Sequence, residues 1–343
     1  MLAHKKLCKM IFCFGISITM FNSVLAIEST ANSDRSFDSW VDRLKNQAFS
    51  KGISEETINN AFFDVQQLPS TNNNITEQAN NYSHLTTSIS PQQVLLNKQL
   101  LNHYRDALFE IKHLFGVDEE VMISIWSMDK SISTNAQPQS AIKILSSLTY
   151  QQPSNKKLQN ELFQALKIID DGQVSAHELR SDPAGNIGSI NFNPTQFRAF
   201  AIDYDGDGTT DLWKSYVDIF ASTANFLASV GWKVNQPWGV EVKIPKELNT
   251  ETISTNSQRS LMKWHKLGLR MKNGSDFPQK NKLASLVQLD KTSGRYFLVF
   301  DNYFALLRWK RSPEFALATG MMIDKIKQQK FSSPVTPFAE VNK

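Results

Sequence analysis

The most constraining feature of the chain is a stretch that is apolar on every face of a helix. Acidic residues suited to a first helical turn, Glu119 and Glu120, come just before Val121-Met122-Ile123-Ser124-Ile125-Trp126. A helix without a polar face has to be covered on all sides, so we expect this one to run through the middle of a core built from other helices.

Apolar residues at helical spacing predict those neighbours. Leu101, Tyr104, Leu108, Ile111 and Phe115 indicate one helix that ends at Gly116. Further helices are expected in two parts of Ser36 to Phe63, with Ser54 as a cap, at Gln139 to Tyr150, Asn155 to Asp170, Asp218 to Val230 and Tyr303 to Gln328. Strand-like pieces are expected at Val240 to Ile244, Ala284 to Leu289 and Tyr296 to Phe300. The chain is therefore predicted to be mainly α, with a small β subdomain.

The N-terminus has the residue order of a secretory signal peptide. Lys5, Lys6 and Lys9 precede an apolar run, and Val24-Leu25-Ala26 resembles a cleavage site. The alternative is a retained N-terminal anchor, but the run is shorter than the roughly 20 residues that span a bilayer, and no later segment approaches that length. We expect residues 1–26 to be the leader, residues 27–36 to be flexible, and the mature protein to be exported without a transmembrane segment.

Loss of the leader would change the composition in two ways. Both cysteines, Cys8 and Cys13, lie within it, so stability would come from packing and not from disulfides. The basic residues would fall from 37 to 34 against 33 acidic residues, which removes the electrostatic argument for a nucleic-acid partner.

An acidic loop raises the possibility of calcium. Asp203, Asp205, Asp207 and Asp211 occupy the first, third, fifth and ninth positions of a calcium-binding loop, and Gly208 occupies the sixth. The twelfth position is Lys214, where a bidentate glutamate is wanted, so any binding is expected to be weak. The alternative is an Asp-rich turn whose carboxylates bond its own backbone.

Several separated segments together resemble the membrane-bound type B family of lytic murein transglycosylases. They occur in one order and at plausible spacing over most of the chain: Phe37-Asp38-Ser39-Trp40, Gly52-Ile53-Ser54, Leu148-Thr149-Tyr150, Phe192-Asn193-Pro194-Thr195, Asp205-Gly206-Asp207-Gly208, Trp238-Gly239-Val240-Glu241-Val242 and Asn302-Tyr303. The resemblance implies an α+β, mainly α fold with a lysozyme-like helical core and a groove for peptidoglycan glycan strands.

The resemblance also implies a domain layout within a region from 37 to 330. It consists of a helical lead-in and loop at 37–92, a helical core with the groove at 93–237, the small β subdomain at 238–300 and a C-terminal helix at 301–330. Since the substrate is the cell wall, the protein is expected to be periplasmic.

The chemistry implied by the family needs one acid and no cofactor. A glutamic acid protonates the glycosidic oxygen between N-acetylmuramic acid and N-acetylglucosamine, and the muramyl 6-hydroxyl closes a 1,6-anhydro ring, unlike the two-carboxylate hydrolases. In the family this acid lies at the end of the buried helix, in a stretch that reads Trp-Gly-(Met/Val)-Glu-Thr. The matching stretch of this chain is Trp126-Ser127-Met128-Asp129-Lys130. Asp129 is thus the candidate catalytic acid, shorter by one methylene, and Lys130 beside it would favour its ionised form.

Other groove positions differ from the family as well. Asn191 and Phe192 stand in the family's Gly-Gln-Phe-Met-Pro segment, Asp182 in its Gly-Ser-Trp-Ala-Gly segment, and Trp309-Lys310 replace its Tyr-Asn pair. Asp182, Asn191, Phe192 and Trp309 are the candidate substrate-binding residues. Two functions remain open: a transglycosylase that uses Asp129, and a weak or inactive member that binds peptidoglycan. Trp213, Trp232, Trp238 and Trp309 are expected either to stack on sugars or to lie in the core.

Overall fold

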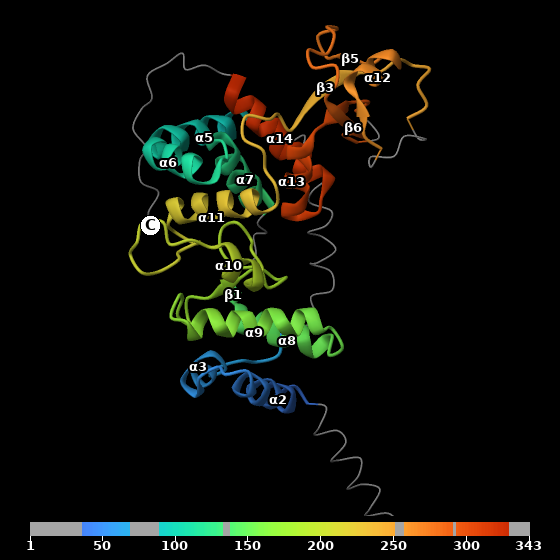
Figure 1. Ribbon diagram of the computed structural model, residues 1–343. Helices are drawn as coiled ribbons and strands as arrows, with labels where there is room; N and C mark the ends of the chain where they lie inside the picture. Colours follow the sequence, from blue (N-terminus) through green and yellow to red (C-terminus); the bar gives the residue numbers. More distant parts are fainter. Residues whose placement is uncertain (1–35, 69–88, 133–137, 251–256, 291–292, 329–343) are drawn as a thin grey trace, which may run out of the picture.

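A computed structural model describes residues 36–68, 89–132, 138–250, 257–290 and 293–328. The predicted leader and residues 27–35 lie outside this part, as does most of the loop expected between the first helices and Pro91. Figure 1 shows helices from one end of an elongated molecule to the other, with the sheet to one side at the far end. The predicted class, mainly α with a lysozyme-like helical core and a small β subdomain, is confirmed. Among the described helices, none is both long enough and apolar enough to cross a membrane.

The helix that is apolar on every face lies at the centre of the fold, as predicted. It is α7, Glu119–Ile132, and its residues from Val121 to Asp129 are all buried. Four helices pack around it: α5 (Pro91–His103), α6 (Arg105–Phe115), α11 (Tyr216–Ser229) and α14 (Pro313–Gln328). The stretch of α7 from Val121 to Asp129 is therefore covered by protein, and Lys130 is the first residue after it that is exposed.

One predicted helix is two in the structure. The periodic run from Leu101 to Phe115 divides at Tyr104, which ends α5 and begins α6. The Tyr104 ring stacks on Tyr216 of α11 at a centroid distance of 5.2 Å, so packing against a distant helix overrides the local apolar period. The predicted end at Gly116 is correct, and this glycine adopts the left-handed conformation with φ of 68°.

The end of the molecule opposite the sheet consists of two pairs of helices (Figure 1). They are α2 (Phe37–Ser50), α3 (Glu55–Ala61), α8 (Ala141–Gln151) and α9 (Lys156–Asp170). Ser54 caps α3 as predicted, because its side chain accepts a hydrogen bond from Thr57 N. Between these helices and the central core lie β1 (Gln139–Ser140), β2 (Arg180–Ser181) and α10 (Pro194–Phe200), which begins with a capping box formed by Asn193 and Gln196.

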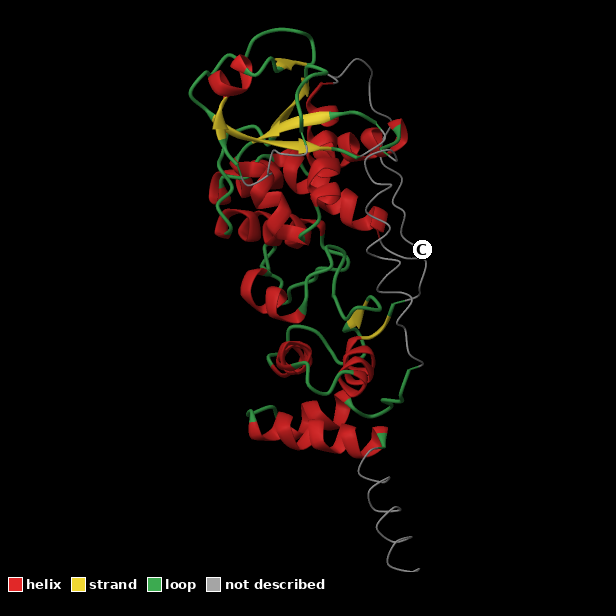
Figure 2. Cartoon of the chain, turned by 90° about the vertical axis from the view of Figure 1, so that its right-hand side faces the viewer, coloured by secondary structure: helices red, strands yellow, loops and turns green. Residues whose placement is uncertain are grey.

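The small sheet is antiparallel and covered on both faces (Figure 2). Its order is β4 (Arg259–Ser260), β6 (Leu283–Gln288), β7 (Tyr296–Val299), β3 (Gly239–Lys243) and β5 (Arg270–Met271). Val287 and Phe297 join the main helical core, while Leu286 and Leu298 join a second core that includes Trp264 of α12 (Leu261–Lys266). This alternation is the period of two expected for a strand. The three predicted strands are present, whereas β4, β5 and α12 were not anticipated.

The single C-terminal helix predicted from Tyr303 to Gln328 is also two helices. They are α13 (Asp301–Lys310) and α14, and Arg311 between them adopts the left-handed conformation with φ of 53°. Pro313 begins α14, since proline suits a first helical turn but cannot continue an earlier helix. The break turns the end of α13 toward α7.

Trp238 at the start of β3 attaches the sheet to α14. Its indole lies against Gly320, where an added Cβ would be 2.3 Å from the ring, and its Nε1 donates a hydrogen bond of 3.2 Å to Asp324 Oδ2. Burial raises the pKa of the Asp324 carboxyl to about 6, opposed by the Trp238 hydrogen bond and the Lys327 charge. The carboxylate is therefore costly to ionise in the folded state.

We expect the replacement Asp324→Asn to remove a pH-dependent part of the stability. The native carboxyl holds its proton up to about pH 6 and the unfolded one only to about pH 4, so its contribution is present below pH 4 and is lost as the pH rises to 6. Relative to the Asn variant, which keeps an acceptor for Trp238, the wild type should lose up to about 3 kcal/mol across that window. Urea unfolding at pH 4, 5, 6 and 7 measures this, with exposed Asp42→Asn as the control. A parallel decline in the wild type and Asp324→Asn would contradict the assignment.

Candidate functional site

Asp129 lies on the last turns of α7 and is sealed from solvent. Its exposed fraction is 0%, and three side chains from two other parts of the chain meet its carboxylate. Trp309 Nε1 donates a hydrogen bond of 2.6 Å to Oδ2, Lys310 Nζ forms an ion pair of 2.8 Å with Oδ1, and Asn191 Nδ2 lies 3.4 Å from Oδ1. Both carboxylate oxygens therefore face donors supplied by the protein itself.

The break after α13 brings the two strongest donors to Asp129. Trp309 and Lys310 are the last two residues of α13. The Trp309 ring lies 5.2 Å from Phe192 and 4.9 Å from Phe226 between centroids, which fixes the indole in an aromatic layer. Lys310 Nζ also lies 3.4 Å from the Asn191 carbonyl oxygen, and its side chain is only 13% exposed.

Asn191 reaches Asp129 because of an unusual backbone conformation. Its φ is 49°, in the left-handed region that asparagine tolerates better than most residues. The turn is closed by hydrogen bonds between the main chains of Ile187 and Phe192. Asn191 therefore lies close to Asp129 within a buried cluster.

Two opposing effects act on the Asp129 carboxyl. Complete burial raises its pKa above the ordinary value, and the Lys310 charge and the donors of Lys310, Trp309 and Asn191 oppose that shift. The Lys310 charge and the three donors favour the ionised form of the carboxyl group, whereas its burial favours the protonated form. A general acid instead needs an O–H directed at the substrate atom that it protonates.

The cation at Asp129 is not the one expected from the sequence. Lys130 was predicted to act on Asp129 as its chain neighbour, but its side chain is exposed and its ammonium lies 5.2 Å from the centre of the Trp126 ring. Successive residues of a helix point in different directions, so adjacency in sequence does not give contact. Lys310, 181 positions away from Asp129, makes the contact instead.

The four candidate substrate-binding residues divide into two groups. Asn191, Phe192 and Trp309 gather around Asp129, but Phe192 and Trp309 are buried in the aromatic layer. Asp182 holds its own turn: its Oδ1 accepts from Ala184 N and Asn186 N, and its Oδ2 accepts from Asn186 Nδ2. The tryptophans Trp238 and Trp309 are only 3% and 6% exposed, so both lie in the core and do not offer a ring for stacking on a sugar.

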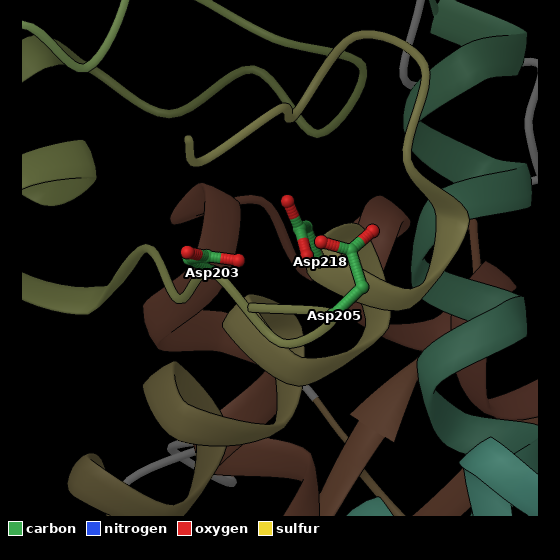
Figure 3. A group of neighbouring side chains, drawn as sticks. All are labelled: Asp203, Asp205 and Asp218. Carbon is green, nitrogen blue, oxygen red and sulfur yellow. The ribbon is translucent and has the colours of Figure 1, made fainter. Parts of the chain in front are cut away.

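The acidic loop brings together a different set of carboxylates from the one predicted (Figure 3). Oxygens of Asp203, Asp205 and Asp218 all lie within 4.8 Å of one another. Asp207 instead accepts from Thr209 N and Oγ1, and Asp211 accepts from Trp213 N and Lys214 N.

Backbone bonding is also present within the group of three. Asp203 accepts from Gly206 N and Gly208 N, and Asp218 accepts from Tyr204 N and Asp211 N. Burial raises the pKa of Asp218, opposed by these bonds. Three carboxylates in a small space are a donor set that suits a hard cation such as calcium.

The sequence analysis missed two residues of these sites. Lys310 was noted in the pair that replaces the family's Tyr-Asn pair, a pair that packs beside the acid in the family, but not as the ion-pair partner of Asp129. Asp218 was expected only as the start of a helix, and its place 15 residues after Asp203 gave no signal of a ligand.

We expect Lys310→Met to destabilise the fold by about 3–5 kcal/mol, because it leaves a buried carboxylate without its cation. Asp129→Asn combined with Lys310→Met should recover most of that loss, since no charge then remains. Urea denaturation of the two single variants and the double variant measures the coupling. Exposed Lys130→Met is the matched control and should change stability by about 0.5 kcal/mol or less. Equal effects of Lys310→Met and Lys130→Met would show that the ion pair contributes nothing.

Comparisons with known proteins identify the family of this chain. The family model described as the transglycosylase SLT domain matches residues 36–324. The chain is 25% identical over 238 residues to membrane-bound lytic murein transglycosylase B of Escherichia coli (strain K12), a match that covers 67% of this chain and 63% of that protein. The chain thus spans slightly less than two thirds of this relative.

Solved structures of lytic transglycosylases are also similar to this chain. SltB3 of Pseudomonas aeruginosa in complex with NAG-anhNAM-pentapeptide is similar with a TM-score of 0.78 and 30% identity, over 85% of this chain and 80% of that one. The Escherichia coli lytic transglycosylase Slt35 in complex with calcium has a TM-score of 0.69 at 21% identity, over 85% of this chain and 92% of that one, which shows a common fold. With a family match over most of its length, this chain belongs to the transglycosylase SLT domain family, as the sequence resemblance indicated.

Proposed function

We propose that this protein is an exported lytic-transglycosylase-type protein that binds peptidoglycan in the periplasm and does not cleave it. The observation that carries the loss of cleavage is the burial of Asp129, whose two carboxylate oxygens are occupied by Lys310, Trp309 and Asn191. A glycosidic oxygen would have to replace at least one of these donors to reach the carboxyl group. The leader-like residues 1–26 and the wall-directed family support export.

Two observations support binding without cleavage: the family scaffold is retained, and residues of the site differ from the family. The scaffold that the family shares is present, and a relative of known structure holds a NAG-NAM-pentapeptide. Four of the residues that differ from the family form the buried cluster, namely Asp129, Asn191, Trp309 and Lys310, whereas Asp182, which also differs, bonds its own turn. They act together, because a shorter acid leaves room for the lysine and the lysine compensates the buried charge.

The alternative is slow 1,6-anhydro cleavage with Asp129 as the acid. One observation favours it: burial raises the pKa of this carboxyl, and a raised pKa keeps a proton on a general acid near neutral pH. In that case Lys310 would have to withdraw from Asp129 before each reaction, and the carboxyl group would still be one methylene short of the family position.

Incubation with purified peptidoglycan sacculi separates the two functions. We expect the wild type to sediment with sacculi and to release no 1,6-anhydro muropeptides detectable by mass spectrometry. The variant Asp129→Glu, Trp309→Tyr, Lys310→Asn restores the family residues and should begin to release them, because the acid is then longer and no longer paired with a lysine. The matched control carries Asp129→Gln with the same two other changes and should remain inactive.

Two other outcomes would contradict the proposal. Anhydro products from the wild type that disappear in Asp129→Asn would overturn the proposal in favour of cleavage. Failure of the wild type to sediment with sacculi would remove the binding function altogether.

We also propose that the acidic loop binds calcium weakly. Asp203, Asp205 and Asp218 would hold the ion, which would link the loop to the start of α11. Lys214 at the twelfth loop position carries a positive charge where a further carboxylate would strengthen binding, so we expect affinity no tighter than about 0.1–1 mM.

Calorimetric titration with calcium tests this. Asp205→Asn should abolish the heat of binding, and Lys214→Glu should tighten binding by about tenfold or more. Asp207→Asn is the matched control and should change little, since that carboxylate bonds Thr209. Equal effects of Asp205→Asn and Asp207→Asn would contradict the assigned ligands.

A further inference from the structure

A trough lies along the face of α13 that is turned away from Asp129. Phe304, Leu307 and Arg308 recur at the spacing of one helical face, Arg311 continues that face, and all four line a cavity of about 680 Å³ whose other wall is formed by α10 and α11. An adjoining cavity of about 470 Å³ shares Phe304 and Arg308 with it. We call this continuous surface the α13 trough.

The α13 trough continues toward the sheet. The second cavity also contains Lys233, Gln258 and Asp301, and a third cavity of about 220 Å³ shares Gln258 and Asp301 and adds Lys282. The trough therefore extends from α10 to the edge of the β subdomain, long enough for an extended ligand.

This surface is separate from the buried cluster around Asp129. Trp309 and Lys310 lie on the opposite face of α13 from Phe304, Leu307 and Arg308. The Phe226 ring stands between the two, since it lines the trough and also contacts Trp309 edge-on at 4.9 Å. A ligand in the trough would touch none of the groups that hold Asp129.

The charges along the α13 trough are mostly positive. Lys233, Lys282, Arg308 and Arg311 face one acid, Asp301, which is already in an ion pair with Lys233. Arg308 Nη1 donates to the Val230 carbonyl oxygen at 3.1 Å, which fixes the guanidinium at the trough and uses one of its five donors. Burial and the Lys233 charge lower the pKa of Lys282, although Asp301 opposes them, so this ammonium would gain from a further anion.

Apolar walls alternate with these cations. Phe200, Phe304 and Leu307 line the cavity of about 680 Å³, and arginine is suited to bidentate binding of carboxylates. An uncharged sugar would leave the cations unused, and a single small anion would leave the apolar walls uncovered. A peptide with small apolar side chains and several carboxylates uses both.

We propose that the α13 trough binds a carboxylate-bearing peptide, the stem peptide of peptidoglycan, at a site separate from the buried cluster around Asp129. This inference rests on the proposed peptidoglycan-binding function and adds a second point of attachment to it. Two linked sites hold a polymer more tightly than either does alone.

Calorimetric titration of the full chain with a synthetic, sugar-free stem pentapeptide tests the proposal. We expect binding that weakens about tenfold in Arg311→Asn and again in Lys282→Gln, since each change removes one charge-assisted contact. Asparagine is chosen at position 311 because it tolerates the left-handed backbone found there. Exposed Lys157→Gln on α9 is the charge-matched control and should bind as the wild type does.

The other outcomes distinguish this site from the proposed function. Binding of a sugar-only glycan strand without binding of the pentapeptide would overturn the trough site and leave the proposed function standing, while binding of neither would overturn both. Pentapeptide binding that is equal in all variants would place the peptide elsewhere. Inorganic phosphate bound as tightly as the peptide, or phosphatidylglycerol vesicles bound in its place, would overturn the peptide assignment.

Discussion

The ion pair between Lys310 and Asp129 is the interaction on which the centre of the molecule depends. A carboxylate at the end of a completely buried helix is tolerable only when a cation and further donors compensate its loss of water. The groups that meet this requirement come from the end of α13, just before the break at Arg311, and from the left-handed turn at Asn191. Asp129, which the resemblance gives as the candidate acid, is thus part of the packing, and the proposed loss of cleavage rests on that burial.

The sequence predicted the parts of the fold that follow from local patterns. The central helix, the caps of the first helices and three of the strands follow from apolar periods and capping residues. Tyr104 and Arg311 divide predicted helices for different reasons: the first break comes from stacking on a distant ring, whereas Pro313 was a local signal that the long apolar period obscured. Strands of two residues such as β4 and β5 are too short to show a period.

The candidate site was harder to predict because its chemistry comes from long-range contacts. The family resemblance named Asp129, Asn191 and Trp309 as candidate site residues, and the structure brings them together. The resemblance gave no sign that Lys310 would form an ion pair with the acid. Asp182 and Asp207 each had a residue type suited to a ligand but use their oxygens on the main chain nearby. Side chains with short polar groups next to glycine or in tight turns more readily serve the turn itself.

The contact between Trp238 and Gly320 has a consequence for how this fold can diverge. The indole occupies the space that any other residue at 320 would need, so the sheet and α14 meet through one ring and one missing side chain. A lineage that replaced the glycine would have to shrink the aromatic residue as well, and with it the indole that bonds Asp324. The two positions should therefore vary as a pair among related proteins, and the β subdomain cannot drift independently of the helices beneath it.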